Sequence, residues 1–329
     1  MVKKFISLGI ECTAHTFGVG IIKGKTPLAN IKHSYTTEKG GIIPTEAGKH
    51  HNELKEKIFS EALTKAGLTI EDIDLISVSN APGLSPCLLV GMNFAKELAK
   101  KYNKPLVGVN HCVAHLEIGK LLTGARDPVL LYVSGANTQI IAYEAGKYRI
   151  FGETLDQGAG NFLDSFARYM GLGFPGGPKI YEISLKAKNY IELPYNVKGM
   201  DFSLTGILTN LKQKYDSGKY TPEDLSYSAQ ETVFAMLIEV AERALAHTGK
   251  KELLIGGGVG CNIRLQEMCK IMCEERGATF FAPPNEVLVD NALMIAWTGL
   301  LMHNAGVKDS LSTLDIKPYE RTDEVEVSW

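Results

Sequence analysis

Two histidines four residues apart are the first residues in this sequence whose types and spacing could do chemistry. They are His111 and His115, within the run His111-Cys112-Val113-Ala114-His115. Residues at i and i+4 share one face of a helix, so the two imidazoles could bind a single metal ion. The pair follows an expected strand, 106–110, and so lies at its carboxyl end, where the sites of α/β proteins gather. The alternative is a pair of histidines at a helix start that bind no metal.

A third ligand is needed to complete such a site, and Asp290 is a good candidate for it. This residue follows the apolar run 287–289 and precedes the last expected core helix. A carboxylate at that place could join the two histidines on a metal. Its default role is N-cap of the helix, and both readings stay open. The zinc-protease motif H-E-x-x-H has a glutamate where this sequence has Cys112, so peptidase chemistry would lack its base.

Segments rich in glycine and other small residues form the second group of candidates. The chain has 33 glycines in 329 residues, more than the roughly 7% of average usage. Glycine lets the backbone approach a ligand closely, and successive N–H groups can cradle phosphates. Three such segments are Ser134-Gly135-Ala136-Asn137, Gly171-Leu172-Gly173-Phe174-Pro175-Gly176-Gly177-Pro178-Lys179 and Gly256-Gly257-Gly258-Val259-Gly260-Cys261-Asn262.

Each of these segments also has an ordinary structural interpretation. The first is a hairpin turn, and the second must be a loop, tightly turned at Gly176-Gly177, that by default connects two helices. The third is a strand-to-helix turn, in which Asn262 is placed to hydrogen-bond a ribose or a base. Near the loop, Glu153, Asp156 and Asp164 could serve a ribose or a metal, or simply be solvated.

The hydrophobic pattern predicts strands and helices in an order that starts again at Asp127-Pro128. Expected strands are Phe5–Ile10, Gly18–Ile22, Leu28–Tyr35, Leu75–Ser79, Leu106–Asn110, Val129–Val133, Thr138–Tyr143, Tyr148–Glu153, Leu253–Gly256 and Thr279–Ala282. Expected helices are Thr45–Leu68, Leu89–Tyr102, one that opens at His111, Asn161–Leu172, Pro178–Lys188, Leu204–Tyr215, Pro222–His247, Cys261–Arg276 and Asn291–His303. Each half begins with a hairpin around a turn of small residues, which indicates a duplication.

Two such βββαβα halves facing each other describe an α/β protein with a duplicated actin-like (ASKHA, RNase H-like) fold. We expect an N-terminal lobe over residues 1–125, a C-terminal lobe over 126–304, and a last segment, 305–329, that returns to the first lobe. Ligands would bind in the central cleft between the two lobes. The alternative is a pair of unrelated α/β domains with ordinary hairpins.

Composition is that of a globular protein and restricts the partners. Lys plus Arg is 35 and Asp plus Glu is 37, which gives a formal net charge of −2. A protein that grips nucleic acid alone is usually basic, so an RNA substrate would need other subunits or a local patch. No apolar run approaches the roughly 18 residues that cross a bilayer, which argues against a membrane. Six cysteines without a C-x-x-C pair fit reduced thiols and a cytoplasmic location.

Taken together, the motifs resemble those of the archaeal and eukaryotic catalytic subunit of the KEOPS complex, a tRNA N6-adenosine threonylcarbamoyltransferase family formerly labelled O-sialoglycoprotein endopeptidase. The resemblance covers essentially the whole chain. It rests on Gly9-Ile10-Glu11-Cys12-Thr13-Ala14-His15, Gly41-Ile42-Ile43-Pro44, His111-Cys112-Val113-Ala114-His115, Tyr132-Val133-Ser134-Gly135-Ala136-Asn137-Thr138, Gly173-Phe174-Pro175-Gly176-Gly177-Pro178, Gly257-Gly258-Val259-Gly260-Cys261-Asn262 and Asp290-Asn291. The tail 321–329 is similar to the archaeal and eukaryotic branch rather than the bacterial one.

The resemblance implies a set of ligand-binding residues. One metal ion, iron or zinc, would be held by His111, His115 and Asp290, with Tyr132 beside the metal or the substrate. An adenine nucleotide (threonylcarbamoyl-AMP, ATP or ADP) would be bound by Tyr132, Val133, Ser134, Gly135, Ala136, Asn137, Asp164, Gly177, Tyr181 and Asn262. Two positions depart from the family: Ala136 stands where glycine is usual, and Tyr181 where an acidic residue commonly contacts ribose, for which Glu182 is a candidate substitute.

The implied reaction moves a threonylcarbamoyl group from its AMP anhydride to N6 of the adenosine beside the tRNA anticodon, with the metal as Lewis acid. Implied partners are tRNA, an atypical kinase-like ATPase subunit, fused after the tail in some archaeal members, and a small dimerising subunit. The rival functions are an actin-like ATPase or kinase, a metallopeptidase, and a non-catalytic scaffold. The two hairpin turns lack the D-x-G aspartate that such kinases use, which argues against phosphoryl transfer.

Overall fold

Two five-stranded sheets with the same strand order make up the protein. The computed structural model describes residues 5–37 and 41–329. The first sheet has the order β3-β2-β1-β4-β5, and the second has the order β8-β7-β6-β11-β12. In each sheet the first three strands pair antiparallel, and the last two join in parallel. The second half repeats the first, so the predicted duplication is confirmed.

The first half alternates strands and helices after an opening meander. Its elements are β1 (Ile6–Glu11), β2 (Thr16–Lys23), β3 (Thr26–Ser34), α1 (Pro44–Ala66), β4 (Leu75–Ala81), α2 (Ser85–Lys101), β5 (Leu106–Asn110) and α3 (His111–Thr123). Helix α3 begins directly at the carboxyl end of β5, where the Asn110 side chain accepts hydrogen bonds from the N–H groups of Cys112 and Val113. This cap fixes the first turn of α3, which carries His111.

The second half has the same pattern with additional helices. Its strands are β6 (Val129–Val133), β7 (Thr138–Glu144), β8 (Lys147–Glu153), the short hairpin β9 (Val197–Lys198) and β10 (Asp201–Phe202), β11 (Glu252–Gly256) and β12 (Thr279–Phe281). Its helices are α4 (Ala159–Tyr169), α5 (Gly177–Ser184), α6 (Thr205–Asp216), α7 (Pro222–Thr248), α8 (Ile263–Glu275), α9 (Asn285–Leu288) and α10 (Ala292–Asn304).

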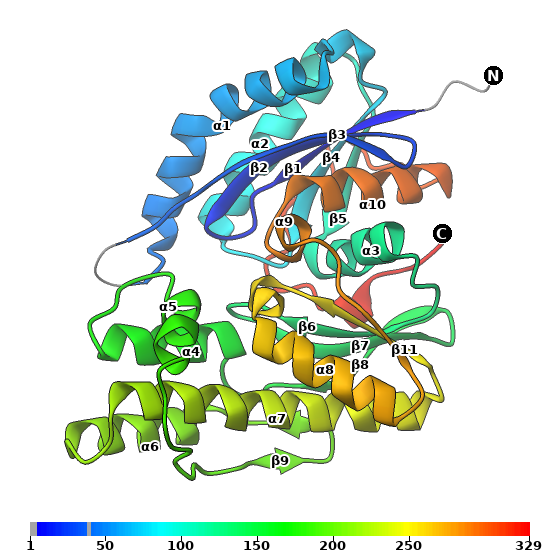
Figure 1. Cartoon of the computed structure of the whole chain (residues 1–329). Coiled ribbons are helices and arrows are strands. Elements are labelled where there is room, and N and C mark those ends of the chain that lie inside the picture. The colour runs from blue at the N-terminus through cyan, green and yellow to red at the C-terminus, as the bar shows by residue number, and fades with distance from the viewer. Residues whose placement is uncertain (1–4, 38–40) are drawn as a thin grey trace.

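The helices form layers around the two sheets (Figure 1). Helices α1 and α2 cover the outer face of the first sheet, and α7 covers the outer face of the second. Helices α3 and α10 pack against each other between the sheets, with α10 on the first sheet and α3 against β11 of the second. The central layer therefore carries both His111 and the residues that precede α10.

Glycines in the first sheet make room for α10. A Cβ on Gly9 would lie 2.3 Å from the backbone nitrogen of Ala296, and a Cβ on Gly20 would lie 2.4 Å from that of Leu293. Real Cβ atoms do not approach backbone this closely, so no other residue type fits under the helix as it stands. These glycines set how far α10 sinks onto β1 and β2, and hence where Asp290 lies.

The last segment runs from the first half to the second. Leu314 is buried in the core of the first half, and the Lys317 N–H donates to the Asn80 carbonyl of β4. Beyond it, Thr322 lies 3.3 Å from Gln139 of β7 in the second half, and the Trp329 indole donates to Glu117 of α3 in the first half. The segment 305–329 therefore contacts both halves, and the predicted division into lobes stays a prediction. Helix α10 also packs on the first sheet. The predicted C-terminal lobe, 126–304, includes this helix.

Helix boundaries differ from the sequence prediction where capping residues set them. Helix α2 begins at Ser85 rather than Leu89, because Pro86 fits the first turn of a helix. Pro178 likewise starts α5 at Gly177, so the segment 171–179 is not wholly a loop as expected. A 3₁₀ turn over Gly258–Cys261 delays α8, for which Asn262 is the N-cap. The hairpin β9–β10 and the one-turn helix α9 were not predicted.

The predicted capping role of Asp290 is wrong. Asn291 is the N-cap of α10, and its side-chain oxygen accepts from the Met294 N–H at 3.1 Å. The Asn291 amide also donates to the carbonyls of Val287 and Val289. Because the neighbouring asparagine caps the helix, the Asp290 carboxylate is not used as a cap and faces His111 and His115.

Replacing Asn291 with alanine is expected to lower the free energy of unfolding by about 2 kcal/mol, through loss of the cap and of two buried hydrogen bonds. Asn291→Asp keeps the capping oxygen but sets a buried carboxylate oxygen against the carbonyls of Val287 and Val289, so its loss should be larger. Urea denaturation of the two variants measures both effects. An Asn291→Ala variant as stable as the parent would contradict the assignment of the cap.

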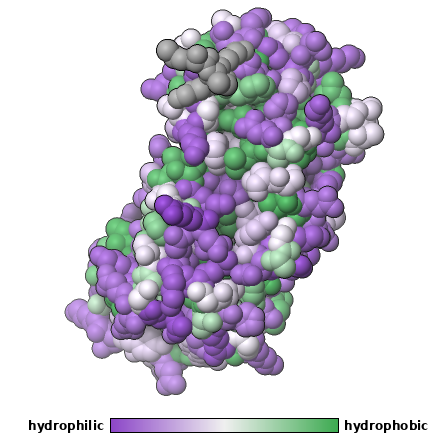
Figure 2. Space-filling model, turned by 90° about the vertical axis from the view of Figure 1, so that its right-hand side faces the viewer, coloured by the Kyte–Doolittle hydropathy of each residue, from purple (hydrophilic) through white to green (hydrophobic). Residues whose placement is uncertain are grey.

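The surface of the molecule is mixed in character. Figure 2 shows a mostly hydrophilic face with small hydrophobic patches distributed along an elongated body. Among the described residues, no helix has both the length and the apolar character needed to span a membrane.

Candidate metal and nucleotide site

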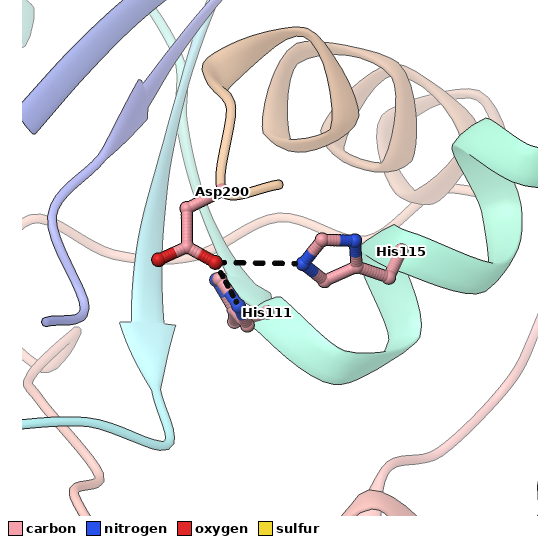
Figure 3. Close-up of side chains that lie close together, drawn as sticks. All are labelled: His111, His115 and Asp290. Carbon is pink, nitrogen blue, oxygen red and sulfur yellow. Dashed lines mark ion pairs between the residues drawn. The ribbon is translucent and has the colours of Figure 1, made fainter. Parts of the chain in front are cut away.

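Three side chains from distant parts of the chain converge between the sheets (Figure 3). His111 and His115 project from the first turns of α3 toward Asp290, which lies just before α10. The Asp290 Oδ1 atom lies 3.4 Å from His111 Nε2 and 3.7 Å from His115 Nε2. One potential ligand atom from each residue lies within 4.8 Å of the others. The predicted third partner of the histidine pair is therefore in place.

Glu11, at the end of β1, orients the first histidine. Its Oε2 atom lies 2.9 Å from His111 Nδ1, while its Oε1 accepts from the N–H and the hydroxyl of Thr13 at 2.7 and 2.6 Å. A carboxylate on Nδ1 fixes a proton there, so Nε2, which lies 3.4 Å from Asp290 Oδ1, is the ring atom that would bind a metal ion in exchange for its own proton. This is the outer-shell arrangement that metal-binding histidines usually have.

Burial and charge act in opposite directions on the two histidines. Burial by itself lowers the pKa of His111, but the Glu11 charge and hydrogen bonds with Asp290 and Glu11 raise it well above its usual value. For His115, burial dominates and lowers the pKa. Burial raises the pKa of Asp290, yet its contacts with His111 and His115 bring it well below the usual range. At neutral pH, Asp290 is an anion and His115 a neutral imidazole, as metal ligands are.

The donor set fits a divalent metal ion. His115 is buried, and its Nε2 has no hydrogen-bond partner among the described residues. A buried, unpaired ring nitrogen that faces a carboxylate and a second imidazole is costly unless an ion binds there. Two imidazoles and one carboxylate suit zinc or iron(II), with coordination positions left open. His111, His115 and Asp290 would hold the ion.

Tyr132 lies beside this cluster at the end of β6. Its ring centroid is 5.2 Å from that of His115, and the side chain is 1% exposed. Burial raises the pKa of its hydroxyl well above the usual value, so the phenol stays protonated at neutral pH. Tyr132 can therefore donate a hydrogen bond toward the cluster, and its predicted role as a metal ligand stays a prediction.

The turn Ser134–Asn137 joins β6 to β7 next to the cluster. The Ser134 N–H and hydroxyl both bond to the Asn137 carbonyl, at 2.9 and 2.8 Å. Among the described residues, the N–H groups of Gly135 and Ala136 have no hydrogen-bond partner. The Asn137 amide contacts Cys112 Sγ at 3.8 Å, which ties the turn to helix α3. Two free N–H groups on an exposed turn suit an anion such as a phosphate.

The other predicted nucleotide residues lie in a second group. The Asp164 carboxylate accepts from the N–H groups of Gly176 and Gly177, and burial raises its pKa. Asn262 caps α8 with its oxygen and donates from its amide to Gln230 at 2.7 Å. Asp164 and Asn262 therefore hold the local backbone, and their contact with a ribose stays a prediction. Tyr181 lines a pocket instead.

That pocket has a volume of about 510 Å³ and lies between α5, α7 and the start of α8. Its lining includes Tyr181, Tyr190, Tyr227, Gln230, Ile263 and an Arg264–Glu231 ion pair. Leu185, Tyr190 and Ile263 are each more than half exposed at its rim. The sequence analysis missed all of these except Tyr181, because their spacing carries no motif and only the packing of α5 against α7 brings them together.

Three polar residues near the cluster were also missed. Glu11 lies in the segment Gly9–His15, and the sequence prediction gave no role to this residue. His15 Nδ1 lies 3.8 Å from Asp290 Oδ2, and its ring meets Phe174 edge-on at 5.8 Å. Lys32 donates to the Asp290 carbonyl. The β1–β2 turn and β3 place all three, so only the pairing of the first sheet could have revealed them.

Two matching halves, with the cluster of His111, His115 and Asp290 between their sheets, define an α/β protein of the actin-like fold. Solved structures agree with the fold: HypF of Thermococcus kodakarensis aligns with a TM-score of 0.63 at 15% identity, covering 90% of this chain and 47% of that one. Component A of Acidaminococcus fermentans (R)-2-hydroxyglutaryl-CoA dehydratase gives 0.56 at 15% identity, over 89% and 97%. These likenesses confirm the predicted fold class.

The chain belongs to the tRNA N6-adenosine threonylcarbamoyltransferase (TsaD) family, whose model matches residues 26–297. A protein of that name from Thermococcus kodakarensis is 57% identical over 98% of this chain and 99% of its own length. A probable bifunctional tRNA threonylcarbamoyladenosine biosynthesis protein from Methanosarcina mazei is 50% identical, and the match covers 99% of this chain and 60% of that protein. The predicted family and a transferase activity are thereby confirmed.

Proposed function

We propose that this chain transfers the threonylcarbamoyl group of threonylcarbamoyl-AMP to N6 of the adenosine beside the tRNA anticodon. The observation that carries the proposal is the contact between the turn Ser134–Asn137 and helix α3, made by Asn137 and Cys112. It sets an anion-binding turn beside the cluster of His111, His115 and Asp290. A phosphate on the turn would then have its acyl group at the cluster.

The reaction forms a bond from N6 of adenosine to the carbamoyl carbon and breaks the bond from that carbon to a phosphate oxygen. AMP leaves with the bonding electrons, and the amine loses one proton. The free N–H groups of Gly135 and Ala136 would stabilise the charge that develops on the departing phosphate. A metal ion at the cluster would supply Lewis acidity toward the threonylcarbamoyl group. Tyr132, held protonated by burial, could donate a hydrogen bond to the same group.

The adenosine part of the adenylate fits the pocket beside Tyr181. An adenine ring is flat and apolar on its faces and polar at its edge. The pocket offers tyrosine rings and Ile263 for the faces, and its polar lining for the edge includes Asn189, Glu231 and Arg264. Tyr181 supplies an aromatic surface where the family commonly has an acidic residue, so ribose binding would rely on Glu182 or on the backbone at Gly177.

Partners and location follow from the same assignment. An anticodon-loop adenosine is single-stranded and can be splayed into a cleft. With a net charge of −2, the chain would share the binding of tRNA with other subunits. The two-part name and greater length of the Methanosarcina relative support a partner from the same pathway, which we take to be the kinase-like ATPase of KEOPS, together with the small dimerising subunit. Such a complex would act in the cytoplasm.

A transfer assay tests the function. The chain, alone and with its partner subunits, is incubated with threonylcarbamoyl-AMP and an unmodified tRNA, and nucleosides are analysed by mass spectrometry. We expect threonylcarbamoyladenosine to form together with one equivalent of AMP. Turnover of ATP or cleavage of peptides without tRNA modification would favour the kinase or metallopeptidase alternative.

A further inference from the structure

Lys32, on β3, reaches the loop that carries the aspartate of the metal cluster. Its Nζ donates to the carbonyl oxygen of Asp290 at 3.0 Å and to that of Glu286 at 3.1 Å. The first acceptor belongs to the residue whose carboxylate faces the two histidines, and the second lies in α9. One ammonium group therefore binds two carbonyls of the segment 286–290, which leads into α10.

This contact joins two parts of the fold that the sequence separates widely. Lys32 pairs with Gly18 of β2, and a Cβ on Gly18 would lie 3.3 Å from Lys32 Cβ and 3.5 Å from Ala292 Cβ. The lysine stem therefore runs directly beside the start of α10. Half-burial of its amine lowers its pKa, against the raising effect of Asp290 and Glu286. The side chain is thus held in one place rather than extended into solvent.

The Asp290 side chain lacks a partner of the kind that Glu11 supplies to His111. His111 is fixed by Glu11 and by the capped first turn of α3. Asp290 lies in a short stretch between α9 and α10 and is not the cap of either helix. The carbonyl contact from Lys32 supplies the missing support, because it fixes the backbone from which the carboxylate projects.

We propose that Lys32 is a positioning residue for the metal centre, which holds Asp290 in the orientation needed to complete the ligand set with His111 and His115. The proposal rests on the proposed metal site but not on the transfer reaction. Loss of an outer-shell partner usually lowers metal affinity about 10- to 100-fold. A purely electrostatic role would have the opposite sign, because an ammonium ion repels a divalent cation and its removal would tighten binding.

Titration of the metal-free protein with Co²⁺ distinguishes these possibilities, since the visible absorption of Co²⁺ reports its coordination. We expect Lys32→Met to weaken Co²⁺ binding about tenfold or more and to change the absorption bands. Lys32→Arg should restore both, because a guanidinium can donate to two carbonyls at once. Lys104→Met is the matched control. The Lys104 amine also donates to a backbone carbonyl, that of Glu71, at 2.8 Å. Lys104 lies just before the first residue of β5, whereas the cluster lies at the other end of that strand.

Unchanged or tighter Co²⁺ binding by Lys32→Met, with the parent's absorption bands, would overturn the proposal. Thermal melting of the metal-free proteins verifies that each variant is folded. If Lys32→Met does not fold, Lys32→Gln takes its place, because the amide is polar but too short to reach both carbonyls. The titration needs no tRNA and no adenylate. A failure of the proposed transfer reaction would therefore leave the result on Lys32 intact, whereas an absence of Co²⁺ binding by the parent protein would remove both the metal site and the role of Lys32.

Discussion

Replacing His115 with alanine is expected to abolish threonylcarbamoyl transfer while leaving the fold largely intact. The Nε2 atom of this buried imidazole has no hydrogen-bond partner among the described residues, and its one charged neighbour, Asp290, keeps its contact with His111. It does remove one of three ligand atoms. The affinity for a divalent metal ion should therefore fall by more than about a hundredfold, the upper end of the cost of losing an outer-shell partner. Metal content by elemental analysis and the transfer assay measure the two losses together.

The matched control for this variant is His303→Ala. His303 lies in α10 and also has a buried ring nitrogen, Nδ1, without a partner among the described residues. It packs on Phe5, with ring centroids 5.3 Å apart, at the end of α10 away from Asp290. The two variants remove the same side chain from α-helices, although His303 is only partly buried, so loss of metal and of transfer is expected for His115→Ala alone. Near-normal transfer by His115→Ala, with a full complement of metal, would refute the metal role of the cluster.

The convergence of His111 and His115 could be predicted because it follows from local rules: a pair at i and i+4 faces one way on any helix, and the pair follows the parallel strand β5. Asp290 follows the helix α9 rather than a strand, so its place in the cluster was predicted from its residue type and from the family resemblance. What the local rules could not decide was which of Asp290 and Asn291 caps α10. Both residue types cap helices, and the choice depends on the carbonyls of 287 and 289, which receive the Asn291 amide.

The supporting residues could not be predicted from their own neighbourhood in the sequence. Glu11 and Lys32 reach the cluster only because β1, β2 and β3 pair in one register, and because α10 returns from the far end of the chain to lie on them. The tyrosines of the pocket are similar, since they come from α5, a loop and α7. Where a site depends on packing between segments distant in the sequence, residue spacing carries no signal of it.

The position of α10 should be highly sensitive to a single methyl group in the first sheet. A Cβ on Gly20 would lie 2.4 Å from the Leu293 nitrogen and 2.5 Å from the Ala292 carbonyl carbon. Both atoms are backbone, so the helix itself must move. We expect Gly20→Ala to lower the free energy of unfolding by about 3 kcal/mol or more, at the upper end of what overpacking a core costs. The displaced helix would carry Asp290 away from the histidines, so metal affinity should fall as well.

Gly206→Ala makes the same chemical change in a place that tolerates it. Gly206 lies in α6, and a Cβ there would meet nothing within 4 Å. Alanine is the better helix former, so this variant should gain roughly 0.5–1 kcal/mol. Urea denaturation should show a lower free energy of unfolding for Gly20→Ala and a higher one for Gly206→Ala. Titration with Co²⁺ should show weaker binding for Gly20→Ala alone. Equal stability of the two variants would mean that α10 does not rest on β2 as closely as the structure shows, and the cluster would then need another explanation for its geometry.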